Sequence, residues 1–165
     1  MGRAVLLFVS LLGRAWAVEP CQPDPPAAGV ASPAVLRLLE VAGKVTHYHQ
    51  PAGRALTACV GRLGVFYTDA LLPPAEVEGP PVRARGFAVL AWLLGVHQHT
   101  FSGQSGEASA DLAGARFAGC ALARIKARGS DLTRQLQYLE QATAPHADST
   151  AWRIAFTEGV SSCAP

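Results

Sequence analysis

The stretch FAVLAWLLGV, residues 87–96, is the longest almost unbroken apolar run outside the N-terminal region. A helix that crosses a bilayer needs about 20 apolar residues, so this run instead suits a helix that is buried on most sides. Its alanines and leucines, and the lack of a neighbouring β-pattern, favour a helix over a buried strand. We expect this helix to begin near Pro81 or Val82 and to bury Trp92 at its centre.

Apolar residues at helical spacing predict further helices on both sides of this one. The predicted segments are 32–50, 52–72, 110–128, 130–143 and a short last helix that begins after Ser149 and holds Trp152, Ala155 and Phe156. We find no internal repeat and no β-hairpin signal. The sequence therefore predicts an all-α fold, a single-domain bundle of about five to six helices over residues 32–165.

Local signals mark several of the predicted helix ends. Ser32 is a good N-cap, and Pro33 suits the first helical position. Gly129 fits the left-handed position after the helix 110–128, and Ser130 then caps the next helix. These residues predict where the helices are separated along the chain.

The N-terminus has the pattern of a bacterial export signal. Arg3 precedes an apolar run, and Ala15-Trp16-Ala17 supplies small residues at the positions that signal peptidase requires. We expect residues 1–17 to be a signal peptide, residues 18–31 to form an extended Pro-rich leader, and the mature protein to be periplasmic or secreted.

Removing residues 1–17 takes away two of the 14 basic residues and leaves 12 against 12 acidic ones, so the mature chain is formally neutral. Scattered, balanced charge gives no electrostatic footprint for nucleic acid or for an anionic membrane surface. We therefore expect neither partner, and no membrane span.

Four cysteines, an even number behind an export signal, predict two disulfides. Cys59 and Cys120 fall on the apolar faces of two predicted helices, so we favour a bond between them, with Cys21 and Cys163 joining the two ends of the chain. The pairing Cys21–Cys59 with Cys120–Cys163 stays open.

The histidines are the clearest candidates for a metal site. His47 and His49 end the first predicted helix, and His97 and His99 end the third. Imidazoles bind zinc and copper well, but residues two apart on a helix point about 200° apart, so neither pair chelates from an intact helix. Histidines also suit a helix C-terminus electrostatically. We favour no metal, and keep as the alternative a periplasmic metal-binding protein that uses both pairs.

Signatures of catalysis and of cofactor binding are absent from the sequence. The run Ser102-Gly103-Gln104-Ser105-Gly106 resembles a hydrolase elbow, but Glu107 stands where the second glycine is required. No phosphate loop, dinucleotide fingerprint or haem attachment motif occurs. We expect no enzyme activity, no catalytic residue and no cofactor.

Short motifs around the cysteines resemble a pattern in small exported helical proteins of Proteobacteria. They are Cys59-Val-Gly, Asp69-Ala-Leu, Ala91-Trp-Leu-Leu-Gly, and Asp111-Leu-Ala followed by Cys120. Over residues 55–140 the order is similar to that of the periplasmic acid-stress chaperones and of the Tai-type immunity proteins of type VI secretion. The resemblance implies a helical, periplasmic, non-enzymatic protein that binds another protein as chaperone or inhibitor, and it supports pairing Cys59 with Cys120.

Overall fold

The computed structural model describes residues 45–47, 58–62, 64–67, 71, 85–101, 109–127, 129–143 and 149–164. The predicted signal peptide (1–17), the leader (18–31), Cys21 and His49 lie outside these residues. The described part is mostly helical, as expected. Its four helices are α3 (Arg85–Phe101), α4 (Ala110–Arg124), α5 (Ser130–Thr143) and α6 (Ser149–Cys163).

A small sheet precedes the helices. Strands β1 (Val45–His47), β2 (Ala58–Val60) and β3 (Val65–Tyr67) pair in the order β1-β3-β2, with β1 parallel and β2 antiparallel to β3. The predicted helix 52–72 is therefore wrong, and the end of the predicted helix 32–50 is a strand. The rest of that helix lies outside the described residues.

A tight hairpin explains why residues 58–67 are not helical. The backbone N–H of Gly61 donates to the carbonyl oxygen of Gly64 at 2.8 Å, and the N–H of Gly64 donates back at 3.4 Å, around a two-residue loop. Each glycine weakens a helix by about 1 kcal/mol, whereas the flanking Val60 and Val65 are β-branched and favour strands. Both faces of the strands are buried, and such an apolar run cannot be told from a helix by periodicity.

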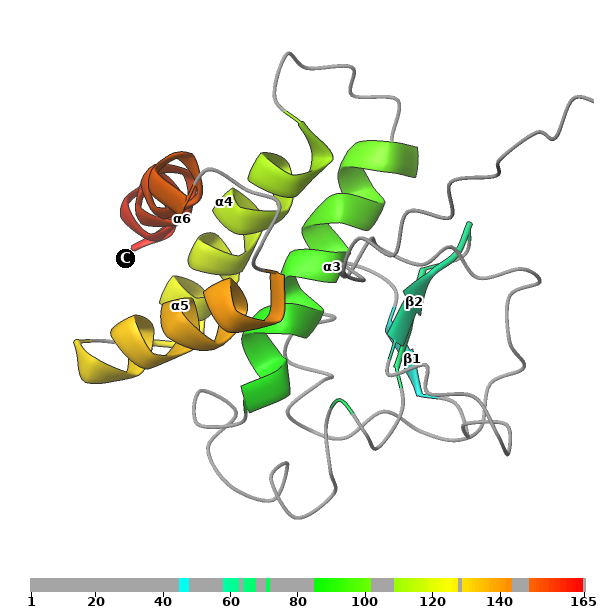
Figure 1. Ribbon diagram of the computed structural model, residues 1–165, viewed down its shortest axis with the longest axis horizontal. Coiled ribbons are helices and arrows are strands. Elements are labelled where there is room, and N and C mark those ends of the chain that lie inside the picture. Colours follow the sequence, from blue (N-terminus) through cyan, green and yellow to red (C-terminus); the bar gives the residue numbers. More distant parts are fainter. Residues whose placement is uncertain are drawn as a thin grey trace, which may run out of the picture.

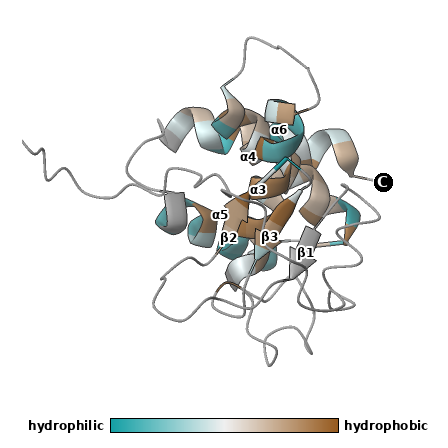
Figure 2. Ribbon diagram, turned by 90° about the vertical axis from the view of Figure 1, so that its right-hand side faces the viewer, coloured by the Kyte–Doolittle hydropathy of each residue, from teal (hydrophilic) through white to brown (hydrophobic). Residues whose placement is uncertain are grey.

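Helix α3 is the centre of the fold. Figure 1 shows it between the sheet on one side and the other helices on the other. Every residue from Gly86 to Val96 is buried, and Trp92 is 4% exposed, which confirms the predicted buried helix. The hydropathy colouring of Figure 2 shows the same hydrophobic helix at the middle of the molecule. None of the described helices combines the length and the apolar character that crossing a membrane requires.

A buried glutamine joins α5 to the start of α3. Gln135 is fully buried, and its Oε1 accepts a hydrogen bond from the backbone N–H of Ala88 at 3.2 Å. Ala88 lies in the first turn of α3, where backbone N–H groups are short of carbonyl partners within the helix. The contact therefore satisfies a polar group at the buried end of α3 and fixes α5 against it.

The end of α4 differs from the predicted end. The helix stops at Arg124, and Lys126, not Gly129, takes the left-handed conformation that ends it, with φ 64°. The N–H of Ala127 donates to the carbonyl of Leu122 at 3.0 Å, which is the bond expected of a Schellman turn. Gly129 also has a positive φ, and its carbonyl accepts the N–H of Thr133 at the start of α5.

Helix α6 runs over Ser149–Cys163 and is thus longer than the short helix expected there. It contains Trp152, Ala155 and Phe156, as predicted, and all three are buried. It packs mainly against α4, and Figure 1 shows it on the far side of α4 from the sheet.

Candidate functional site

Helices α4 and α6 are in backbone contact along one line, which we call the α4–α6 seam and define by Gly119, Gly159 and the disulfide beside them. A Cβ atom on Gly159 would overlap the carbonyl oxygen of Arg116, and one on Gly119 would overlap that of Phe156. No side chain fits between the two helices at these points. The glycines therefore set how closely α4 and α6 approach each other.

A disulfide closes the seam. Cys120 in α4 and Cys163 at the end of α6 are bonded, with their Cα atoms 5.0 Å apart. The favoured pairs Cys59–Cys120 and Cys21–Cys163 are therefore wrong. The physical reason is that Cys59 lies in β2 on the other side of α3, whereas the glycine contact brings α6 directly onto α4. Cys59 is disulfide-bonded as well, and its partner lies outside the described residues.

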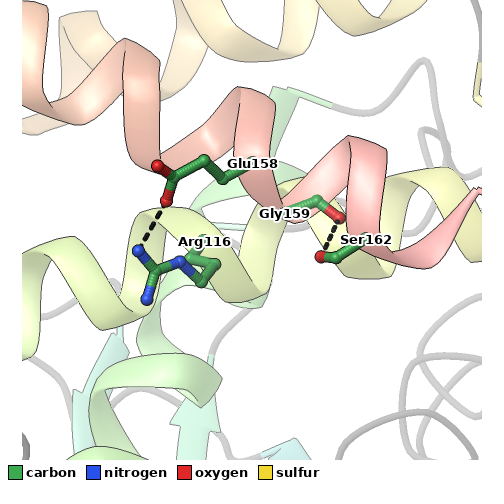
Figure 3. Close-up of polar contacts among 4 residues, drawn as sticks. All are labelled: Arg116, Glu158, Gly159 and Ser162. Atoms are coloured by element: carbon green, nitrogen blue, oxygen red, sulfur yellow. Dashed lines mark hydrogen bonds and ion pairs between the residues drawn. The ribbon is translucent and has the colours of Figure 1, made fainter.

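Polar groups cover the outside of the seam (Figure 3). The guanidinium of Arg116 in α4 pairs with the carboxylate of Glu158 in α6 at 2.5 Å, and the Ser162 hydroxyl donates to the carbonyl of Gly159 at 3.1 Å. Arg116 and Glu158 are each about half exposed, so water screens their attraction and the pair adds little stability. Its main effect is to fix the charge pattern on this surface.

A second ion pair connects α6 to α5. Arg153 donates two hydrogen bonds to the carboxylate of Glu140, at 2.6 and 3.2 Å. The hydrogen bond with Glu140, and then its charge, raise the pKa of the Arg153 guanidinium, which is protonated at neutral pH in any case. Helix α6 is thus held by polar contacts on both sides of its outer surface.

Two large hydrophobic side chains are exposed among the described residues. Ile154 in α6 is 55% exposed, and Phe101 at the end of α3 is 48% exposed. Ile154 and Glu158 are four residues apart and share a face of α6. Ile154 thus lies beside charged groups held in ion pairs to two neighbouring helices.

The two tryptophans meet in the interior where α3, α4 and α6 come together. The rings of Trp92 and Trp152 have centroids 5.7 Å apart. Trp92 Nε1 donates to the carbonyl of Asp111 at 3.3 Å, while Trp152 Nε1 is buried with no hydrogen-bond partner among the described residues. A Cβ on Gly114 would lie 2.5 Å from Trp92 Cδ1, so the glycine makes room for the indole.

The histidines do not assemble into a cluster within the described residues. His97 and His99 both lie in α3, which stays helical to Phe101, so their side chains leave the helix in different directions. His47 lies in β1, not at a helix end. No group of three or more metal-ligating side chains occurs in the part of the chain that is described.

Comparisons with known proteins found no match: no family model, no curated protein and no solved structure matches this chain.

The α4–α6 seam could not be predicted directly from the sequence. Gly119 and Gly159 each lie within an apolar helical pattern. A glycine in such a pattern indicates only a locally weaker helix. Each glycine has a cysteine near it in the sequence, Cys120 one residue and Cys163 four residues further on. Small residues next to cysteines on two helices are the one signal that would have favoured the observed pairing.

Proposed function

We propose that this chain is an exported, non-catalytic protein that binds another protein through the outer surface of α6. The observation that carries the proposal is Ile154, a large hydrophobic side chain, 55% exposed, on a helix that a disulfide and backbone contacts hold in place. A rigid surface loses little conformational freedom on binding, so more of its contact energy is available as affinity.

Charged side chains in ion pairs lie around Ile154 on this surface. Protein interfaces combine an apolar centre with a polar rim. The paired charges of Arg153 with Glu140, and of Arg116 with Glu158, would supply that rim. Because the Cys120–Cys163 bond and the glycine contacts hold α6 in place beneath these side chains, the surface suits one specific partner, as an inhibitor or immunity protein has. A chaperone needs a more adaptable surface for many clients.

The Cys120–Cys163 bond supports the export part of the proposal. Structural disulfides persist in the periplasm and outside the cell and are rare in the cytosol. Together with the signal-like residues 1–17, the bond favours a periplasmic or secreted location.

Affinity capture with site-specific variants tests the binding surface. The oxidised protein recovered after export would be immobilised and incubated with extracts of periplasmic and secreted proteins. We expect the wild type to retain one partner protein in a fixed molar ratio to itself, and the Ile154→Asp variant not to retain that partner. Arg62→Asp is the control. Arg62 is exposed in the hairpin on the other side of α3, so this variant should still retain the partner. Equal capture by all three proteins would reject the surface.

The same preparations distinguish the two kinds of binding protein. An inhibitor-like protein should hold one partner stoichiometrically and leave the aggregation of an unrelated acid-denatured protein unchanged. Suppression of that aggregation, equally by wild type and by Ile154→Asp, would instead indicate chaperone activity on another surface.

A further inference from the structure

Helix α6 is anchored unevenly along its length. Its first half carries three buried side chains, Trp152, Ala155 and Phe156. Of residues 157–164, all of which are described, only Gly159 is buried, and a glycine has no side chain to contribute to the core. Val160 is partly buried against the core cluster. The first half of α6 is therefore held by hydrophobic burial, whereas the second half has little of it.

Two contacts between side chains fasten this second half to α4. The disulfide joins Cys163, the last residue of α6, to Cys120 in α4. One turn earlier, Glu158 pairs with Arg116 (Figure 3). Both charged groups are about half exposed, so water screens their attraction and the pair adds little. The disulfide is therefore the main fastening of about the last two turns of α6.

The two bonded cysteines of the seam differ from Cys59 in exposure. Cys120 and Cys163 are both partly exposed, whereas Cys59 is disulfide-bonded and only 3% exposed. Thiol–disulfide exchange begins when a thiolate reaches a sulfur atom, so access helps to decide which bond is reduced first. A reductant should therefore attack the Cys120–Cys163 bond before it attacks the bond of Cys59.

We propose that the Cys120–Cys163 bond is a redox modification site whose reduction releases the second half of α6 from α4. The reductant is a dithiol protein reductase of the export compartment. Its thiolate attacks one sulfur atom to form a mixed disulfide, and its second thiol then displaces the protein. Two electrons and two protons pass to Cys120 and Cys163, and the reductase is left as a disulfide.

Reduction would change the surface that is proposed to bind the partner. Ile154 belongs to the anchored half of α6, whereas Glu158 lies in the half that is released. The apolar centre of the surface would stay in place while part of its polar rim is lost, so the affinity for the partner should fall. This consequence rests on the proposed function, but the release of α6 does not.

Stepwise reduction of the exported protein with dithiothreitol tests the site. Freed thiols are alkylated without denaturant and located by peptide mass analysis. We expect Cys120 and Cys163 to be labelled together while Cys59 is still bonded. Labelling of Cys59 first, or at the same time, would overturn the proposal, as would a Cys120–Cys163 bond that resists reduction until the protein unfolds.

Hydrogen exchange of the oxidised and the reduced protein tests the release. In the reduced protein, amides of residues 158–163 should exchange about tenfold faster or more. Low concentrations of denaturant should leave that rate unchanged, because a local opening exposes little surface. Amides of residues 152–156 should still exchange through global unfolding, at rates that rise with denaturant. The same behaviour in both halves of α6 would contradict a local release.

The double variant Cys120→Ser/Cys163→Ser is the matched control. It should exchange like the reduced wild type, both with and without dithiothreitol, because it has no seam bond to reduce. A further increase within 158–163 on adding dithiothreitol would assign the effect to the bond of Cys59 and reject the proposal. If the variant does not fold, reoxidation of the reduced wild type should restore slow exchange.

The exchange data stand apart from partner capture. Faster exchange in 158–163 on reduction, with no partner captured by either form, would reject the proposed function and leave the redox site standing. Unchanged exchange, with a partner captured equally by both forms, would reject the redox site and leave the proposed function standing.

Discussion

Trp92 and Trp152 pack against each other in the interior, with ring centroids 5.7 Å apart and ring planes inclined at 44°. Only Trp92 has a hydrogen-bond partner for its indole N–H among the described residues, the carbonyl of Asp111. The two side chains are chemically identical, but only the Trp92 N–H donates a hydrogen bond within the described residues. Substituting the two tryptophans should therefore change the stability of the protein by different amounts.

We predict that Trp92→Ala lowers the free energy of unfolding by about 3–5 kcal/mol, because it leaves a large cavity beside Gly114 and removes a ring pair. Trp152→Phe should change stability by less than about 1.5 kcal/mol, because it keeps an aromatic ring and removes a buried N–H that is unsatisfied within the described residues. Urea unfolding of the oxidised proteins measures both. A loss below about 1 kcal/mol for Trp92→Ala would mean that α3 is not the core.

Lys126 gives a prediction in which a glycine stabilises the protein. Its φ of 64° is costly for a residue with a Cβ, and its side chain is exposed. We predict that Lys126→Gly raises the free energy of unfolding by about 0.5–1 kcal/mol.

Arg124→Gly is the matched control for Lys126→Gly, since it replaces another exposed basic residue two positions earlier, at the last helical position of α4. That variant should lower stability by about 0.5–1 kcal/mol, because Arg124 does not have a positive φ and a glycine there only adds backbone freedom to the unfolded chain. Thermal unfolding of the two variants side by side measures the difference, and equal effects would argue against the turn at Lys126.

The C-terminal helices were predictable because their apolar residues recur on one face while exposed polar residues separate them. The predicted 130–143 segment coincides with α5, and Trp92 is buried as expected from its place in the apolar run. The predicted end of α4 was wrong because Lys126 adopts the left-handed conformation that glycine usually adopts. The prediction had placed that conformation at Gly129, three residues later.

The sheet and the disulfide could not be derived from local patterns. Cys59 fits a helical period and a two-sided strand equally well, and only its pairing with Phe66 across the hairpin decides between them. Cys120 meets Cys163 because Gly119 and Gly159 let two helices touch, which is a tertiary relationship between distant residues. Sequence periodicity carries no information on such a contact.

Export is tested by the N-terminus of the mature protein. Ala15 and Ala17 match the small residues that signal peptidase requires before a cleavage site, so we predict a mature chain that begins at Val18. Intact-mass analysis of the periplasmic or secreted protein measures this, with Ala17→Pro as a variant that should not be processed. Recovery of folded, disulfide-bonded protein that retains Met1 would contradict the prediction.

At the α4–α6 seam, replacing a helical glycine with alanine should destabilise the protein, which is the opposite of the usual effect. Replacing a glycine with alanine inside a helix ordinarily stabilises by about 1 kcal/mol. At Gly159 the added Cβ would overlap the carbonyl oxygen of Arg116 and lie 3.0 Å from the amide nitrogen of Cys120, and both are backbone atoms that cannot rotate away. We therefore predict that Gly159→Ala lowers the free energy of unfolding by about 1–3 kcal/mol, the usual cost of overpacking.

Ser161→Ala is the control for Gly159→Ala, because Ser161 is exposed two residues later in α6 and its substitution should be neutral or slightly stabilising. Denaturant unfolding should be measured with the Cys120–Cys163 bond intact and again in the double Cys→Ser background. When the bond is intact, it closes a loop of 43 residues and holds the two helices together. Removing it should by itself lower the free energy of unfolding by about 4 kcal/mol. In its absence α6 can move away from α4, and the penalty of Gly159→Ala should then decrease. An alanine that stabilises in both backgrounds would mean that the two helices are not in backbone contact.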